Sequence, residues 1–129
     1  MTESDKQLLQ EIHAHIDTHG DAVKDVAFEV DDVRIAYSTA VANGATGVQS
    51  PLTTNDKDGE VVTAVIGTFG DTTHTLVERS NYRGIFLPGY RAVESHDPVN
   101  DFLPVIEMED IDHCVGNQDW DQMQETCEL

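Results

Sequence analysis

The stretch that decides the fold reads Asp25-Val-Ala-Phe-Glu-Val30, then Asp31-Asp32, then Val33-Arg-Ile-Ala-Tyr-Ser-Thr-Ala-Val-Ala-Asn-Gly44. In its first part apolar and polar residues alternate, which is typical of a half-buried strand. In its last part apolar residues recur at helical spacing, at Val33, Ala36, Tyr37, Ala40 and Val41. Asp31-Asp32 offers a helix N-cap, and Asn43-Gly44 offers a C-terminal stop. The change of period predicts a strand followed directly by a helix.

Three more strands are expected after this helix. One lies around Val48, where Pro51 indicates either an edge strand or an early end. The turn residues 55–59 lead into a strand over 60–69, which is apolar on both faces. Residues 73–79 return as the last strand. The predicted order is β-α-β-β-β, with the helix packed on one face of the sheet.

A first helix precedes this unit. Ser4 and Gln7 form a capping-box pattern, and apolar residues follow at helical spacing until Gly20. His15 and His19 share one face of this helix, but no carboxylate completes a metal-binding HExxH arrangement, so we expect surface or packing roles for them. With this helix included, the sequence predicts an α+β unit over residues 1–80.

Regular patterns break after residue 80. Glycines and prolines interrupt residues 81–104, which are therefore predicted to be an irregular linker that crosses from one unit to the next. Its expected tethers to the sheet are Tyr82, Phe86, Leu87 and Tyr90. A strand pattern resumes over 105–114, and a helix pattern begins at residue 119 and continues to 129.

The charge balance restricts the classes of partner. Lys and Arg number 7 against 25 Asp and Glu, which gives a net charge of −18. The acidic residues are spread along the chain, which indicates that they lie on a solvated surface. Such a surface repels nucleic acid and anionic membranes. A net charge of this size indicates a protein adapted to a salt-rich cytoplasm, because salt screens the repulsion between its acidic side chains. An ordinary acidic protein is the alternative.

Targeting and cysteine patterns point to the same compartment. No apolar run approaches the ~20 residues of a membrane helix, and the first residues do not look like a signal peptide. Cys114 and Cys127 lack a CxxC spacing, so neither a disulfide framework nor a zinc site is indicated. We predict a soluble, cytoplasmic protein.

One short motif carries metal chemistry. In Ile111-Asp-His-Cys-Val-Gly-Asn-Gln118, His113 lies in a strand-like run before a Gly-Asn turn. A neutral imidazole held on a strand is a good ligand for iron or zinc. A catalytic metal usually needs three protein ligands, so His113 requires two further partners.

Four segments closely resemble 4-hydroxyphenylpyruvate dioxygenases, in that family's order and at nearly its spacing. They are Gly20-Asp-Ala-Val-Lys-Asp-Val-Ala-Phe-Glu-Val30, Gly70-Asp-Thr-Thr-His-Thr-Leu-Val-Glu-Arg-Ser-Asn-Tyr82, Phe86-Leu-Pro-Gly-Tyr90 and the motif around His113. The resemblance implies a vicinal-oxygen-chelate fold, whose βαβββ modules pair into cupped sheets. It also implies Fe(II)-dependent oxidation of 4-hydroxyphenylpyruvate by dioxygen to homogentisate and CO2, in tyrosine catabolism. Two histidines and one glutamate hold the iron in that family.

Carried over by position, His113 matches the family's first iron-ligating histidine. The family's second histidine and its glutamate correspond to positions past Leu129, and a further module precedes the position of Met1. The resemblance therefore implies three parts. Residues 1–80 are a non-catalytic module with an N-terminal helix, 81–104 are a linker, and 105–129 begin the catalytic domain.

The family's two domains resemble duplications, so the module in residues 1–80 can be compared with the catalytic one. Asp25 stands where the catalytic module has its histidine, and Thr75 stands where it has its glutamate. Glu78 is three residues away and should point to the opposite face. His74 is expected to be structural. The resemblance thus implies that this module holds no metal and that the chain alone is inactive.

Two alternatives stay open beside an incomplete dioxygenase. One is a non-catalytic binding or scaffold module that works with a separate catalytic half. The other is a hydroxymandelate synthase, a relative with the same iron site and substrate. The expected small-molecule partners are a 2-oxo acid and dioxygen. A lone module leaves an uncovered sheet face and unpaired edges, so we also expect a homo-oligomer or pairing with the missing half.

Overall fold

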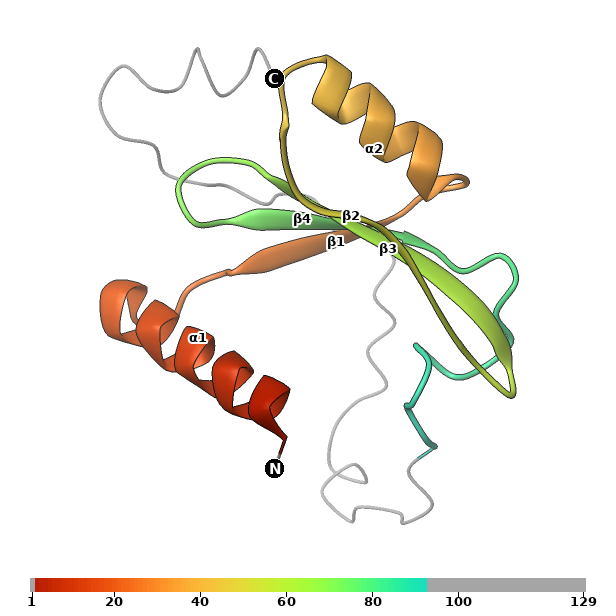
Figure 1. The fold of residues 1–129 in the computed structure, drawn as a ribbon, viewed down its shortest axis with the longest axis horizontal. Helices are drawn as coiled ribbons and strands as arrows, with labels where there is room; N and C mark the ends of the chain where they lie inside the picture. Colours follow the sequence, from red (N-terminus) through yellow and green to blue (C-terminus); the bar gives the residue numbers. More distant parts are fainter. Residues whose placement is uncertain (1, 93–129) are drawn as a thin grey trace, which may run out of the picture.

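Residues 2–92 form a four-stranded sheet with α2 on one side and α1 on the other, as the computed structural model shows (Figure 1). The elements, in order, are α1 (Glu3–His19), β1 (Asp25–Glu29), α2 (Val33–Ala42), β2 (Thr46–Asp56), β3 (Gly59–Gly67) and β4 (Thr73–Glu78). The predicted α+β class and βαβββ order are confirmed. Residues 93–129 are outside the described part of the chain, and with them the predicted strand over 105–114, the predicted helix from 119 and His113.

The strands lie in the order β1-β4-β3-β2. β1 runs parallel to β4, whereas β3 runs antiparallel to both of its neighbours, β4 and β2. The pairing sets Val62 opposite Glu78 and Ala64 opposite Leu76. Because paired residues share a face, these four lie on the side that α2 covers. The opposite side, which we call the open face, carries the alternate residues of each strand.

The core lies between α2 and the sheet. Val33 and Ala64 are fully buried, and Val62 and Leu76 are nearly so. Val33 is the first residue of α2, and two carboxylates accept the N–H groups that the helix start leaves free. Asp32 accepts from the Ile35 N–H at 2.9 Å, and Glu78 accepts from the Val33 N–H at 3.0 Å. The predicted Asp32 cap is confirmed, and Glu78 adds a second acceptor from β4.

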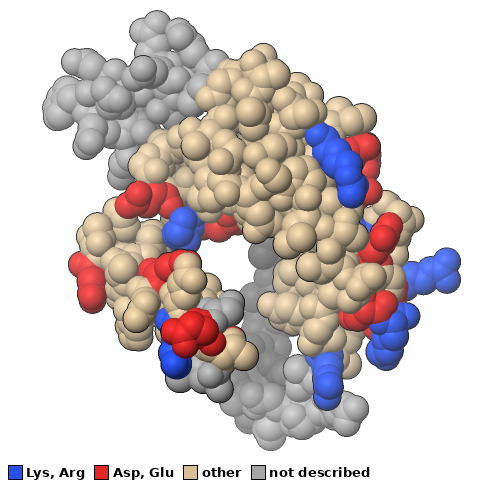
Figure 2. Space-filling model, in the orientation of Figure 1, with Lys and Arg blue, Asp and Glu red and all other residues tan. Residues whose placement is uncertain are grey.

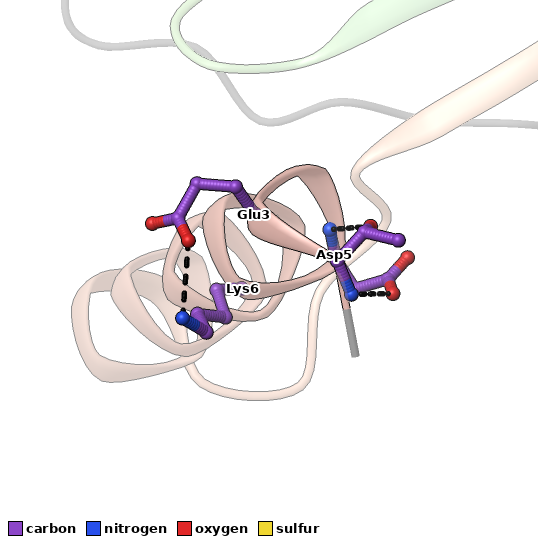
Figure 3. A network of polar contacts seen from close by, with 4 residues as sticks. Glu3, Asp5 and Lys6 are labelled. Atoms are coloured by element: carbon purple, nitrogen blue, oxygen red, sulfur yellow. Dashed lines mark hydrogen bonds and ion pairs between the residues drawn. The ribbon is translucent and has the colours of Figure 1, made fainter.

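The N-terminal cap of α1 lies two residues earlier than predicted. Thr2 is the N-cap and forms a reciprocal capping box with Asp5, so the prediction for Ser4 and Gln7 is wrong (Figure 3). Thr2 and Asp5 have the same spacing as the predicted pair, and a carboxylate is also favoured by the helix dipole at this end. Gly20 ends the helix with a positive φ of 66°, as predicted.

β2 is longer than predicted. Pro51 does mark an edge strand, but the strand continues through it to Asp56. The pairing with β3 shifts register between Gly47 and Gln49 and again between Gln49 and Leu52. Pro51 therefore falls where the ladder skips residues and where its missing N–H interrupts no pairing.

The segment after β4 folds back on the tip of the β2–β3 hairpin. Tyr82 is buried, and its hydroxyl donates to Asp56 at 3.1 Å. The Gly89 N–H donates to the same carboxylate oxygen at 3.2 Å. Tyr82 is thus a tether, as predicted, whereas Phe86 and Tyr90 are exposed and contact each other edge to face at 5.1 Å.

Residues 2–92 contain neither a buried charged side chain nor a helix that could span a membrane.

Candidate functional site

The open face carries the positions that the sequence singles out for comparison with an iron site. Polar side chains line a hollow of about 300 Å³ there, together with apolar residues of the sheet and of the segment after β4. Its lining residues are Asp25, Ala27, Glu29, Thr63, Thr75, Val77, Arg79, Phe86 and Leu87. The open face is therefore mixed in character and partly covered, not uniformly apolar.

A carboxylate with two hydroxyl donors lies at one end of this hollow. The parallel pairing of β1 with β4 sets Asp25 beside Thr73, and Thr75 follows on the same face. The Thr73 hydroxyl donates to the Asp25 carboxylate at 2.5 Å, and the Thr75 hydroxyl donates to the same oxygen at 3.0 Å. Positions 25 and 75, which the sequence comparison matched to iron-ligand positions, therefore lie within hydrogen-bonding distance of each other.

These donors do not fit a site of two histidines and one glutamate. Thr75 offers a neutral hydroxyl where the comparison requires a carboxylate, and that hydroxyl already donates to Asp25. Within residues 2–92 no group of three or more His, Cys, Asp or Glu side chains is arranged to hold a metal ion. The described module thus has a carboxylate–hydroxyl cluster at the compared positions, and no iron chemistry can be assigned to it. His113, the predicted ligand, is outside the described residues.

Glu78 and His74 lie on the other side of the sheet. Glu78 caps α2 through the Val33 N–H, so the prediction that it points away from Thr75 is confirmed. His74 packs edge to face against Phe28 at 5.0 Å, and its Nδ1 lies 3.2 Å from the Val26 carbonyl oxygen. These contacts give His74 a packing role, as expected.

The paired histidines of α1 face the turn between β3 and β4. Their rings lie 4.7 Å apart, which confirms that His15 and His19 share a face. His19 Nε2 lies 2.8 Å from the Asp71 carboxylate, and this hydrogen bond and the charge of His19 lower the pKa of Asp71. Lys24 donates to the Asp71 carbonyl at 2.8 Å. Asp71 thus anchors the end of α1, a role that its place in a turn motif did not indicate.

Comparison with known proteins finds close relatives along almost the whole chain. The chain is 56% identical to a 4-hydroxyphenylpyruvate dioxygenase of Coccidioides posadasii over 124 residues, which are 96% of the chain and 31% of that protein. It is 54% identical over 125 residues to the Aspergillus fumigatus dioxygenase of that name, with the same coverage. The Pyricularia oryzae dioxygenase is 51% identical over 130 residues and matches 100% of the chain. The chain spans about 31% of the length of these curated relatives.

Among solved structures, a triple mutant of 4-hydroxymandelate synthase from Streptomyces coelicolor is similar at 35% identity. The match covers 53% of this chain and 20% of that chain, with a TM-score of 0.49. No protein-family model matches the chain.

Proposed function

The chain belongs to the 4-hydroxyphenylpyruvate dioxygenase family, and from that premise we propose that it serves the oxidation of 4-hydroxyphenylpyruvate to homogentisate. The single observation that carries this proposal is identity of 51% to 56% with three dioxygenases of that name along nearly the whole chain. Dioxygen and the 2-oxo acid are the proposed small-molecule partners, in tyrosine catabolism. These relatives support the dioxygenase over a hydroxymandelate synthase.

We propose a division of labour along the chain. Residues 1–80 are a non-catalytic module of the vicinal-oxygen-chelate type, 81–104 are a linker, and 105–129 begin the catalytic domain. His113 is the proposed Fe(II) ligand, and the family's second histidine and glutamate complete the site. The engaged Asp25–Thr75 pair supports this division, because it leaves the first module no donor set of its own.

A second candidate function is a scaffold module that acts beside a separate catalytic half. The observation that favours it is the construction of the described module. It has a buried core and a capped helix, and the Asp25 carboxylate on its open face accepts hydrogen bonds from the hydroxyls of Thr73 and Thr75. In both candidate functions residues 1–80 support the catalysis without performing it.

Three further properties are part of the proposal. We propose a cytoplasmic protein adapted to high salt, which is supported by the net charge of −18 and by the absence of any fully buried charged side chain in residues 2–92. We also propose self-association through the open face or the sheet edges. β1 and β2 lie at the two edges of the sheet, where another strand can pair.

A chimera tests the proposed function. In it, this chain replaces the matched 31% of the Aspergillus fumigatus dioxygenase. With Fe(II) and 4-hydroxyphenylpyruvate, we expect the chimera to consume oxygen and the chain alone to consume none. His113→Ala in the chimera should abolish the uptake, because one of three ligands is lost. The control is His13→Ala, which removes an exposed histidine of α1 and should leave the rate unchanged.

Two results would contradict the proposal. The first is a folded chimera that binds iron but consumes no oxygen, because the chain would then lack the family's role. The second is substrate-dependent uptake by the chain alone that His113→Ala removes. That result would mean that the chain holds its own ligands or shares them between copies.

A further inference from the structure

The few cations of this acidic chain are not evenly placed. The chain has 7 Lys and Arg residues, and three of them, Lys57, Arg83 and Arg91, line one hollow of about 540 Å³. The hollow lies between the tip of the β2–β3 hairpin and the segment after β4. Figure 2 shows lysine and arginine side chains gathered on that side of the molecule, with several acids among them.

Hydrogen bonds hold the two walls of this hollow together. The Arg83 N–H donates to the Asp58 carbonyl at 2.9 Å, which joins the second wall directly to the hairpin turn. The Asp56 carboxylate accepts from the Asp58 N–H, the Tyr82 hydroxyl and the Gly89 N–H, at 2.8, 3.1 and 3.2 Å. The cations therefore project from a cross-linked frame, so less ordering is needed when a ligand binds.

The charges in the hollow are unbalanced. Among the described residues, Asp58 is the one acid in the lining of this hollow, and its carboxylate lies 3.8 Å from the Lys57 ammonium. Neither Arg83 nor Arg91 forms an ion pair with any residue in the range 2–92. Three positive charges against one negative charge leave an excess of two, in a chain whose net charge is −18. Such a local reversal of sign attracts anions that the rest of the surface repels.

We propose that this hollow binds a small anion with two or more negative charges on clustered oxygens, the chemistry that phosphate esters and polycarboxylates share. Guanidinium groups bind such oxygens through paired hydrogen bonds, and an ammonium adds a point charge. The volume is in the range of small-molecule sites, ~300–1,000 Å³. The Tyr90 ring and Ile85 also line the hollow and offer apolar walls for the rest of the ligand.

A small ligand fits better than a polymer. A nucleic acid strand needs a line of cations along its backbone, whereas this chain offers one cluster on an otherwise acidic surface. The same surface repels an anionic membrane. This inference is independent of the proposed oxidation, because none of its residues belongs to the open-face hollow or to the His113 motif.

The test is titration of the full chain with inorganic phosphate and, separately, with citrate, at constant ionic strength set by KCl. Amide chemical shifts in NMR spectra report the site directly. We expect shifts at 57–58, 83–84 and 90–91, and few on α1 or α2. The double variant Arg83→Gln/Arg91→Gln should weaken binding about tenfold or more, since charge-assisted hydrogen bonds are lost.

A matched control removes the same charge elsewhere. Lys6 pairs with Glu3 on α1, and Arg34 donates to Thr53, so neither residue lines the hollow. The double variant Lys6→Gln/Arg34→Gln therefore removes two positive charges from other parts of the chain. Its affinity for the anion should stay within about twofold of the parent chain's. The tighter of the two anions identifies the phosphate or the carboxylate source, and either supports the proposal.

Three outcomes would overturn it. One is that neither anion shifts these amides beyond the effect of KCl alone. Another is that the shifts persist in the Arg83→Gln/Arg91→Gln variant. The last is that only a polyanion such as heparin binds. If the double variant fails to fold, the map of shifts on the parent chain still decides between a local site and a diffuse salt effect.

Discussion

Asp56 shows how one carboxylate can hold a segment that has no regular structure. Its two oxygens accept from Asp58, Tyr82 and Gly89, which come from the hairpin turn and from two points of the segment after β4. The N–H of Asp58 has the largest effect in lowering the pKa of this carboxyl below its usual value, and the bonds from Gly89 and Tyr82 lower it further. The ionised form is therefore preferred in the folded state, and stability is linked to pH.

We expect Asp56→Asn to lower the free energy of unfolding at neutral pH. The pKa of Asp56 is lower in the folded chain than in the unfolded chain, so its stabilising effect is complete above about pH 4. This effect is lost as the pH falls through the lowered value, and the difference between variant and parent should shrink there. Urea unfolding at several pH values measures it. The control is Asp17→Asn, an exposed aspartate of α1, and an Asp56→Asn effect that is the same at every pH would contradict the linkage.

Local residue chemistry is predictable from the sequence only when the partners are near in the chain. Asp32 precedes its helix directly, so its cap is predicted correctly. Asp56 reads only as a turn residue, because Tyr82 and Gly89 lie 26 and 33 residues away. The contact of Asp71 with His19 spans 52 residues and is missed for the same reason. The Thr2 cap was missed for another reason, since two candidate capping boxes overlap within the first seven residues.

At the scale of elements, the packing of α2 on the sheet forms the buried core cluster. Val33 is fully buried at the start of α2 and packs with Val62, Ala64 and Leu76. Its N–H is also held by Glu78 of β4. The helix start is thus fixed to the sheet by packing and by a hydrogen bond at the same residue.

Val33→Ala should lower the free energy of unfolding by ~2 kcal/mol, because two buried methyl groups are lost and a cavity remains. Val41→Ala is the matched control on the same helix, where the side chain is 40% exposed, and it should cost well under ~1 kcal/mol. Chemical denaturation followed by circular dichroism measures both. Equal losses for the two variants would mean that the core is not where this structure places it.

Strand positions were predicted better than strand ends. The positions and order of β1 and β3 are correct, and the apolar run in β3 follows from burial. The alternation in β1 predicted a half-buried strand, but only Val26 of β1 is half-buried and Phe28 is 48% exposed, because β1 lies at an edge of the sheet. The extent of β2 was not predictable, because Pro51 is compatible with an edge strand only when the ladder shifts register beside it. The prediction that Glu78 faces away from Thr75 is confirmed, since alternation fixes which side of a strand each residue faces.

At the scale of the whole molecule, the net charge opposes self-association, whereas the open face favours it. Two copies of a chain with net charge −18 repel each other at low ionic strength. The open face nevertheless has apolar side chains to bury, among them Leu52, which is 52% exposed and pairs with Thr63 on that face. At about 1 M salt the Debye length falls to ~3 Å, so the repulsion is screened while apolar burial persists.

We therefore expect the chain to be monomeric or poorly folded at low salt and to form a compact dimer in about 1 M KCl, as sedimentation velocity would show. Leu52→Glu places a charge on the open face and should shift the dimer toward monomer. Ile35→Glu adds the same charge at a side chain of α2 that is 65% exposed and should leave the dimer intact. If the parent chain is instead a monodisperse monomer with a cooperative melt in molar salt, the open face does not need a second copy to be stable. The segment that packs Tyr82 against the hairpin and lines the open-face hollow with Phe86 and Leu87 would then be sufficient cover for the module.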